Sequence, residues 1–187
     1  MASTLKINNL DTASGTTITI PTGKTLVGTD EGSFRVPGTV LQVVQGERTA
    51  WTPTPSTTFV STSNQATITP KSTSSKILIV ATFNGVYADD AANMIIVSLY
   101  RTIGSGSASS IKSVTTNHMH NYGTGQAGQQ YSTALCHQHY DTPNTTSAVL
   151  YSYYMRSRDG GTVGINNYGS EGDNTSSCSV SLMEIAQ

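Results

Sequence analysis

Charge is scarce in this sequence, and the two signs nearly balance. Only 11% of the 187 residues are Asp, Glu, Lys or Arg, and the net charge is -1. A protein that binds nucleic acid needs a basic surplus to neutralise phosphates, and none is present. We therefore expect no nucleic-acid partner.

Long apolar runs and helical periodicity are lacking as well. The longest apolar runs are about five residues, whereas a membrane-spanning helix needs about 20. No stretch of a dozen residues keeps apolar positions at the i, i+3, i+4 and i+7 spacing of an amphipathic helix. We expect neither membrane insertion nor a helical domain.

Cysteine is nearly absent. Cys136 and Cys178 are the only two, which is too few for a disulfide framework, and they form no C-x-x-C pair. Each falls in a strand-like apolar segment. We expect both to be buried free thiols.

Alternation of apolar and polar residues, the period of a half-buried strand, recurs along the whole chain. Turns rich in Gly, Ser, Asn and Pro separate the alternating segments, as at residues 21–23, 61–65 and 104–107. Residues 76–83 are apolar on both faces, which predicts a central strand, and a loop is expected at 85–93. The pattern predicts an all-β fold, an antiparallel sandwich or barrel. Strands are predicted at 16–20, 24–27, 40–44, 58–60, 66–69, 76–83, 94–101, 148–155 and 178–182.

The chain divides into two parts of different composition. Residues 1–36 have few aromatics and only short strand signals, and Pro37-Gly38 begins the remainder. We interpret residues 1–36 as an extended attachment arm and residues 37–187 as the β-sandwich head. A two-stranded piece is marginal in water, so the arm must pack on the head or on other copies of the chain.

Several segments resemble bacteriophage tail-fibre and virion structural proteins, especially those of marine phages and cyanophages. The likeness rests on Ile68-Thr69-Pro70 followed by Ser75-Lys76-Ile77-Leu78-Ile79, on the N-terminal segments, and on the closing Val180–Gln187. This resemblance implies a homotrimer with a jelly-roll head like that of tumour necrosis factor. It also implies a location on the virion, an arm attached to other virion proteins, and a host-surface glycan or protein as partner.

All four histidines lie in two H-x-H pairs, His118 with His120 and His137 with His139. In a strand the members of each pair share one face. A catalytic zinc would also need a general base, and no paired carboxylate or H-E-x-x-H pattern is present. An octahedral metal on a trimer axis would take one H-x-H from each chain, as in the long tail fibres of T-even phages. The third interpretation is surface histidines, or histidines hydrogen-bonded within a sheet. We favour this one, with no cofactor, and leave the axial metal open.

Tyrosine is concentrated in the second half of the chain, among amides and hydroxyls. Tyr supplies rigid contact area with a polar tip, which suits recognition of glycans or proteins. We expect Tyr151 and Tyr153 to be sandwich residues, one of them buried. The residues that we predict to contact a receptor are Tyr122, Tyr140, Tyr168 and Asn167.

No enzyme is predicted. Gly104-Ser105-Gly106 lacks the G-x-S-x-G spacing of a hydrolase, and no repeat of constant period indicates a polysaccharide depolymerase. We predict a non-enzymatic trimeric tail fibre or spike that adheres to a host surface. The alternative is a trimeric decoration or head-fibre protein on the capsid.

Overall fold

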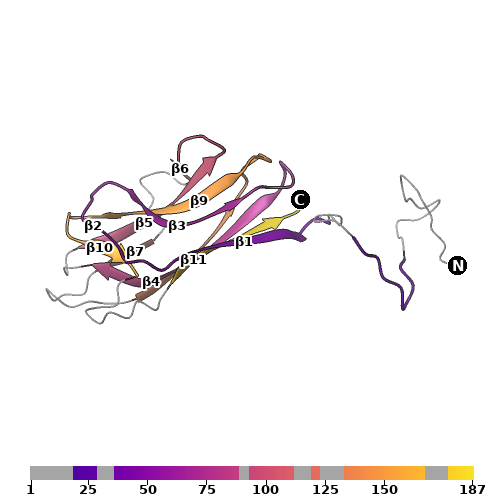
Figure 1. Ribbon diagram of the computed structural model, residues 1–187, viewed down its shortest axis with the longest axis horizontal. Helices are drawn as coiled ribbons and strands as arrows, with labels where there is room; N and C mark the ends of the chain where they lie inside the picture. The colour runs from indigo at the N-terminus through magenta and orange to yellow at the C-terminus, as the bar shows by residue number, and fades with distance from the viewer. Residues whose placement is uncertain (1–18, 29–35, 89–92, 112–118, 123–132, 167–176) are drawn as a thin grey trace.

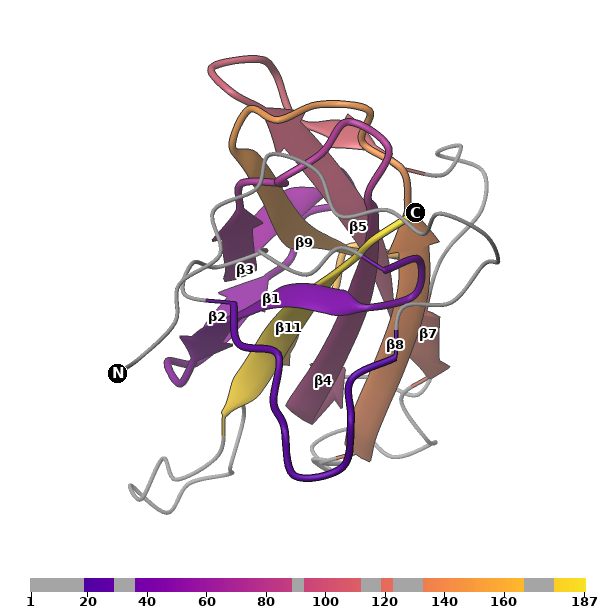
Figure 2. The same ribbon diagram turned by 90° about the vertical axis from the view of Figure 1, so that its right-hand side faces the viewer.

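The chain folds into two antiparallel sheets that face each other across one core (Figure 1, Figure 2). The computed structural model describes residues 19–28, 36–88, 93–111, 119–122, 133–166 and 177–187. The predicted all-β antiparallel sandwich is confirmed. Among the described residues, no helix is long and apolar enough to span a membrane.

One sheet has the order β1-β11-β4-β10-β2, and β8 also pairs with β4. The other has the order β3-β9-β5-β6, and β7 also pairs with β5. The strands are β1 Val40–Arg48, β2 Thr52–Thr54, β3 Val60–Ile68, β4 Lys76–Ala88, β5 Met94–Ile103, β6 Ser109–Ser110, β7 Met119–Tyr122, β8 Thr133–Asp141, β9 Val149–Ser157, β10 Val163–Ile165 and β11 Cys178–Ile185.

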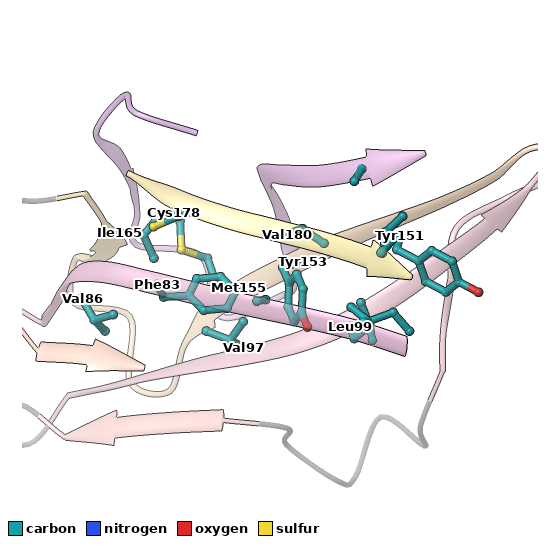
Figure 3. Packing of buried hydrophobic residues seen from close by; sticks show 14 of the residues in the cluster. Phe83, Val86, Val97, Leu99, Tyr151, Tyr153, Met155, Ile165, Cys178 and Val180 are labelled. Atoms are coloured by element: carbon teal, nitrogen blue, oxygen red, sulfur yellow. The ribbon is translucent and has the colours of Figure 1, made fainter. Parts of the chain in front are cut away.

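The core is built from the inward-facing residues of both sheets (Figure 3). Phe83 of β4 meets Tyr153 of β9 edge to face, with ring centroids 4.9 Å apart. Tyr151 and Tyr153 are both fully buried, although we expected only one of them to be. They occupy positions i and i+2 of β9, so the same pleat turns both inward.

Residues 76–83 form the centre of the first sheet, as predicted. β4 pairs with β11 over Lys76–Thr82 on one side and with β8 over Ile77–Val86 on the other, and its last residues, Tyr87 and Ala88, pair with β10. Ile77 and Ile79 are fully buried between the sheets, whereas Leu78 and Val80 are half-buried on the outer face. The loop predicted at 85–93 is wrong for its first part, because β4 continues to Ala88. A register shift between Phe83 and Val86, with Gly85 at φ 59°, lets the strand bend without ending.

The prediction of two strands flanking a turn at 61–65 is wrong. These residues belong to a single strand, β3, which is bulged against β9. The register passes from the Ser61–Tyr154 pair to the Gln65–Ser152 pair, so three residues of β3 oppose Tyr153 alone. Ser63 has φ 58°, and the Thr62 hydroxyl donates to the Tyr153 carbonyl at 2.7 Å. The bulge therefore accommodates Thr62 and the positive φ of Ser63 without ending the strand.

The described part of the predicted arm contains no strand. Residues 19–28 are exposed throughout and lie apart from the sandwich in Figure 1. The strand predictions for residues 19–20 and 24–27 are therefore wrong, because none of the described strands pairs with this segment and an unpaired extended segment forms no ladder. The predicted turn is confirmed, since the Lys24 N–H donates to the Pro21 carbonyl at 3.0 Å. Residues 16–18 lie outside the described part of the chain, and the boundary at 36/37 remains a prediction.

An ion pair joins the two sheets at one end of the sandwich. Arg101 of β5 donates to both carboxylate oxygens of Asp141 in β8, at 3.0 and 2.9 Å. The hydroxyl of Tyr151, from β9, donates to the same carboxylate at 2.7 Å. We call these three residues the inter-sheet clamp. Burial and the Asp141 carboxylate raise the pKa of Tyr151, so its hydroxyl remains a donor.

A second buried carboxylate ties the last strand to the turn that precedes β4. Glu184 of β11 is fully buried and accepts hydrogen bonds from Gln42 Nε2 at 2.5 Å and from the Lys71 N–H at 2.7 Å. Hydrogen bonds to the charged form compensate for burial of a carboxylate. Two of the segments that carry the phage resemblance, at residues 68–79 and 180–187, are thereby in direct contact.

Candidate functional site

Strand β8 contains three of the predicted site residues. His137, His139 and Tyr140 all lie on it, and the pleat separates them between its two faces. His120 and Tyr122 lie on β7, where the backbone ladder pairs them with Ile96 and Met94. His118, Asn167 and Tyr168 fall outside the described residues, so the structure does not place these three predictions.

The histidine pair lies on the inner face of β8, at the open edge of the sandwich. β8 pairs His137 with Ala81 and His139 with Ile79, both of which face the core. The two imidazole rings stack with centroids 6.2 Å apart and planes at 11°. His137 and His139 therefore share a face, as the strand period predicts.

His137 is joined to the opposite sheet through Tyr153. Its Nδ1 and the Tyr153 hydroxyl share a hydrogen bond of 2.7 Å, and the two rings meet edge to face. Burial raises the pKa of Tyr153, which keeps the phenol protonated. This is the hydrogen-bonded, in-sheet arrangement that the sequence favoured.

Two imidazoles on one face could contribute two ligands to a metal ion. Within the described ranges, no group of three or more His, Cys, Asp or Glu side chains converges. The axial metal expected from the H-x-H pairs also depends on His118, outside those ranges, and stays a prediction.

The outer face of the same sheet presents an apolar row across four strands. The ladders pair Val43 of β1 with Met183 of β11, Met183 with Leu78 of β4, and Leu78 with Tyr140 of β8. Val43 is 60% exposed and Tyr140 56% exposed. We call these four residues the apolar row. None of them is charged, and each leaves apolar surface in contact with water.

The surroundings of the apolar row are polar and almost uncharged. The next row across the sheet consists of Gln45, Ser181, Val80 and Gln138. On the other side, a hollow of about 470 Å³ lies beside Tyr140. Its lining residues are Lys76, Tyr140, Thr142, Ile185 and Gln187. An apolar centre within a polar rim is the composition of a protein–protein interface.

The two cysteines differ in environment, so the expectation that both are buried is wrong for Cys136. Cys136 is on the outer face of β8 and exposed, whereas Cys178 is buried and free. The outward turn of Cys136 follows from the pleat, since its neighbours Leu135 and His137 turn inward. Burial raises the pKa of the Cys178 thiol, which lowers its thiolate fraction.

One cysteine per chain should therefore react quickly with a thiol reagent at neutral pH. We expect one fast equivalent with Ellman's reagent from the folded protein and a second only after unfolding in guanidinium. Cys136→Ser should abolish the fast phase, and Cys178→Ser should leave it unchanged. Two fast equivalents from the folded chain would contradict the burial of Cys178.

Sequence reasoning identified Tyr140 but missed the rest of the apolar row. Val43, Leu78 and Met183 come from three strands far apart in sequence, and only the register between strands puts them in line. The signal that could have found Leu78 is the two-faced apolar character of residues 76–83. No family model matches this chain, and no curated protein matches it.

Proposed function

We propose that this chain is a non-enzymatic virion protein whose head associates with two further copies of itself through the apolar row on the outer face of β1, β11, β4 and β8. The observation that supports this most directly is the apolar row. In this patch Val43 is 60% exposed and Tyr140 is 56% exposed, and Leu78 and Met183 between them are half-buried. Because none of the four side chains is charged, another copy can cover the patch without removing a charge from water. Three copies around an axis would bury three such patches in a closed assembly.

The strand order supports a jelly-roll head of the kind found in tumour-necrosis-factor-like trimers. The sheet that carries the proposed contact contains the strand order β1-β11-β4-β8, and the opposite sheet contains the order β3-β9-β5-β7. This interleaves early and late strands in both sheets. Together with the segments that resemble phage fibres, it favours a spike or fibre tip over a catalytic domain.

The proposal gives Tyr140 a role different from the one expected from sequence. In it, the Tyr140 ring packs between copies and does not contact a receptor. His137 and His139 point to the opposite side of β8, toward the core, so they take no part in this contact. The exposed apolar residues of the arm, Leu26 and Val27, are proposed to attach the trimer to other virion proteins.

Adhesion to a host surface is the function proposed for the trimer, because weak sites on three heads act together. Decoration of the capsid is the alternative. Competition separates the two. Free protein that adheres should block adsorption of the virus to cells, and a decoration protein should not.

Self-association is tested by sedimentation velocity on the full chain at micromolar concentration. We expect the wild type to sediment as three times 19.7 kDa. The double variant Val43→Lys/Tyr140→Lys should sediment as a monomer, because six like charges would meet in the contact. Both side chains are largely exposed, so the variant should keep the circular dichroism spectrum of the wild type.

The matched control is Gln65→Lys/Thr67→Lys. These two residues are exposed on the outer side of β3, on the sheet opposite the proposed contact, and the substitution adds the same charge. It should leave the trimer intact. A folded wild-type chain that sediments as a monomer would overturn the proposal.

A further inference from the structure

Three aromatic rings and an arginine gather on the outer face of the second sheet, far from the apolar row. Tyr100 of β5 and Tyr154 of β9 have ring centroids 4.2 Å apart, and Phe59 lies 6.0 Å from Tyr100. The guanidinium carbon of Arg156 sits 5.4 Å from the Phe59 ring centroid. We call these four residues the aromatic–arginine cluster. All four are half-buried, so each side chain is packed on one side and open to water on the other.

The two tyrosine hydroxyls of this cluster form no hydrogen bond within the part of the chain that the structure describes. Tyr151 and Tyr153 of the same strand β9 each place the hydroxyl in a hydrogen bond of 2.7 Å. The hydroxyls of Tyr100 and Tyr154 have no such partner among the described residues. Burial, and then the neighbouring Tyr154, raise the pKa of Tyr100, so its hydroxyl remains a donor.

The arginine of the cluster also differs from the other arginines near it. Arg101 and Arg158 each pair with a carboxylate, at 2.9 and 2.8 Å. Among the described residues, Arg156 makes one hydrogen bond, a long one of 3.4 Å to the Ser157 carbonyl. Most of the donors of its guanidinium are therefore available to a ligand.

No acidic residue of the supporting segments competes for that guanidinium. The strands β5 and β9 and the segment 56–61 contain no Asp or Glu. Beside the rings they present a small hydroxyl residue instead, the exposed Ser61, which pairs with Tyr154. The face therefore combines apolar rings, neutral hydrogen-bonding groups and a single positive charge.

We propose that the aromatic–arginine cluster binds an acidic saccharide, a sugar that carries a carboxylate. The apolar face of a sugar ring packs against aromatic side chains, and its hydroxyls bond to the phenol tips and to Ser61. The planar fork of Arg156 matches a carboxylate with two parallel hydrogen bonds. One cation is too few for a nucleic-acid backbone, whose binding requires several phosphate contacts.

This inference names a ligand class for the adhesive part of the proposed function, and it rests on that part alone. The cluster lies on the sheet opposite the proposed contact between copies. A saccharide should therefore bind to a monomeric variant as well as to a trimer. Failure of self-association and failure of this site are thus separate results.

Titration calorimetry and saturation-transfer NMR on the full chain test the site. The probes are a hyaluronan tetrasaccharide and sialyllactose, with neutral lactose and a poly-glutamate peptide as comparisons. We expect at least one acidic saccharide to bind and lactose to bind about tenfold more weakly or not at all. Tyr100 and Tyr154 should be the aromatic residues whose signals respond.

Two substitutions examine the named contacts. Arg156→Gln should weaken the binding of the acidic saccharide about tenfold or more and leave the binding of lactose unchanged. Tyr154→Ala should weaken the binding of acidic and neutral sugars alike. The control Arg158→Gln removes an equal charge from a neighbouring exposed pair and should have no effect, and Val43→Lys/Tyr140→Lys should bind with the same affinity per chain.

Three results would overturn the inference. The folded wild type could bind none of the acidic saccharides. It could bind one with an affinity that Arg156→Gln and Tyr154→Ala leave unchanged. It could also prefer the poly-glutamate peptide, which would make the face a docking site for acidic protein.

Discussion

Replacing Gly46 with alanine is expected to destabilise the fold by about 3 kcal/mol or more, because the new methyl group has no room. Gly46 lies where β1 crosses against the backbone of β3. A Cβ at this position would overlap the carbonyl oxygen of Gln65 and stand 2.9 Å from its carbonyl carbon and 3.3 Å from the Ala66 Cβ. Backbone cannot rotate aside as a flexible side chain can, so the two sheets would have to separate.

Guanidinium unfolding followed by circular dichroism measures this effect. Gln45→Ala is the matched control, since it changes the adjacent exposed position of the same strand and should shift the free energy of unfolding by less than about 0.5 kcal/mol. Equal stability of Gly46→Ala and the wild type would show that β1 does not pack on β3 at this distance.

Asp141→Ala should cost about 3 kcal/mol in the free energy of unfolding, because it leaves Arg101 and Tyr151 without their shared acceptor. This value is at the lower end of the range for breaking a buried ion pair, since the Arg101 side chain is 27% exposed and water can partly solvate it. Tyr151→Phe removes only one hydrogen bond to the carboxylate and should cost about 1.5 kcal/mol. The double variant should cost less than the sum of the two.

The exposed pair Arg158–Asp159 provides the control for the inter-sheet clamp. Its side chains are 38% and 46% exposed, and the ion pair is 2.8 Å long. Asp159→Ala should change stability by less than about 1 kcal/mol, as is usual for a surface ion pair. If Asp141→Ala were as mild as Asp159→Ala, the clamp would contribute nothing to holding the sheets together.

The strands that sequence reasoning predicted best are those with the strongest apolar character. β4 and β5 each contain an uninterrupted run of Ile, Leu or Val, at residues 77–80 and 95–97, and these apolar runs identify them as buried strands. β8 was recognised only as a strand-like segment around Cys136 and not as a strand with bounds, because its inward positions include His137 and His139. Their place in the sheet depends on the Tyr153 hydroxyl, a partner that no local pattern reveals.

The errors at Ser61–Gln65 and in the arm have a common physical origin. A polar segment continues as a strand when a neighbour offers hydrogen bonds, and an alternating segment fails to form one when no neighbour is present. Thr62 has Tyr153 opposite, whereas no strand of the described ranges pairs with Leu26 and Val27. In both cases, pairing with a segment far away in the sequence decided whether a strand formed, and the β-propensity of the segment itself did not.

For the same reason, sequence reasoning could predict the candidate surfaces only in part. Tyr140 was named as a contact residue from its type. Its alignment with Met183 and Leu78, and the approach of Phe59 to Tyr100, follow from strand register. Register is set by the whole sheet, so residue types alone could not supply these groupings.

The position of β11 in its sheet governs the order in which the strands can pair as the protein folds. β11 carries residues 178–185, yet it lies between β1 and β4, whose residues are made far earlier. During synthesis, β1 has no partner on that side until β11 leaves the ribosome, so the first sheet closes late. Such distant pairing slows folding, and the β4 edge that β11 will occupy stays unpaired in the nascent chain until then.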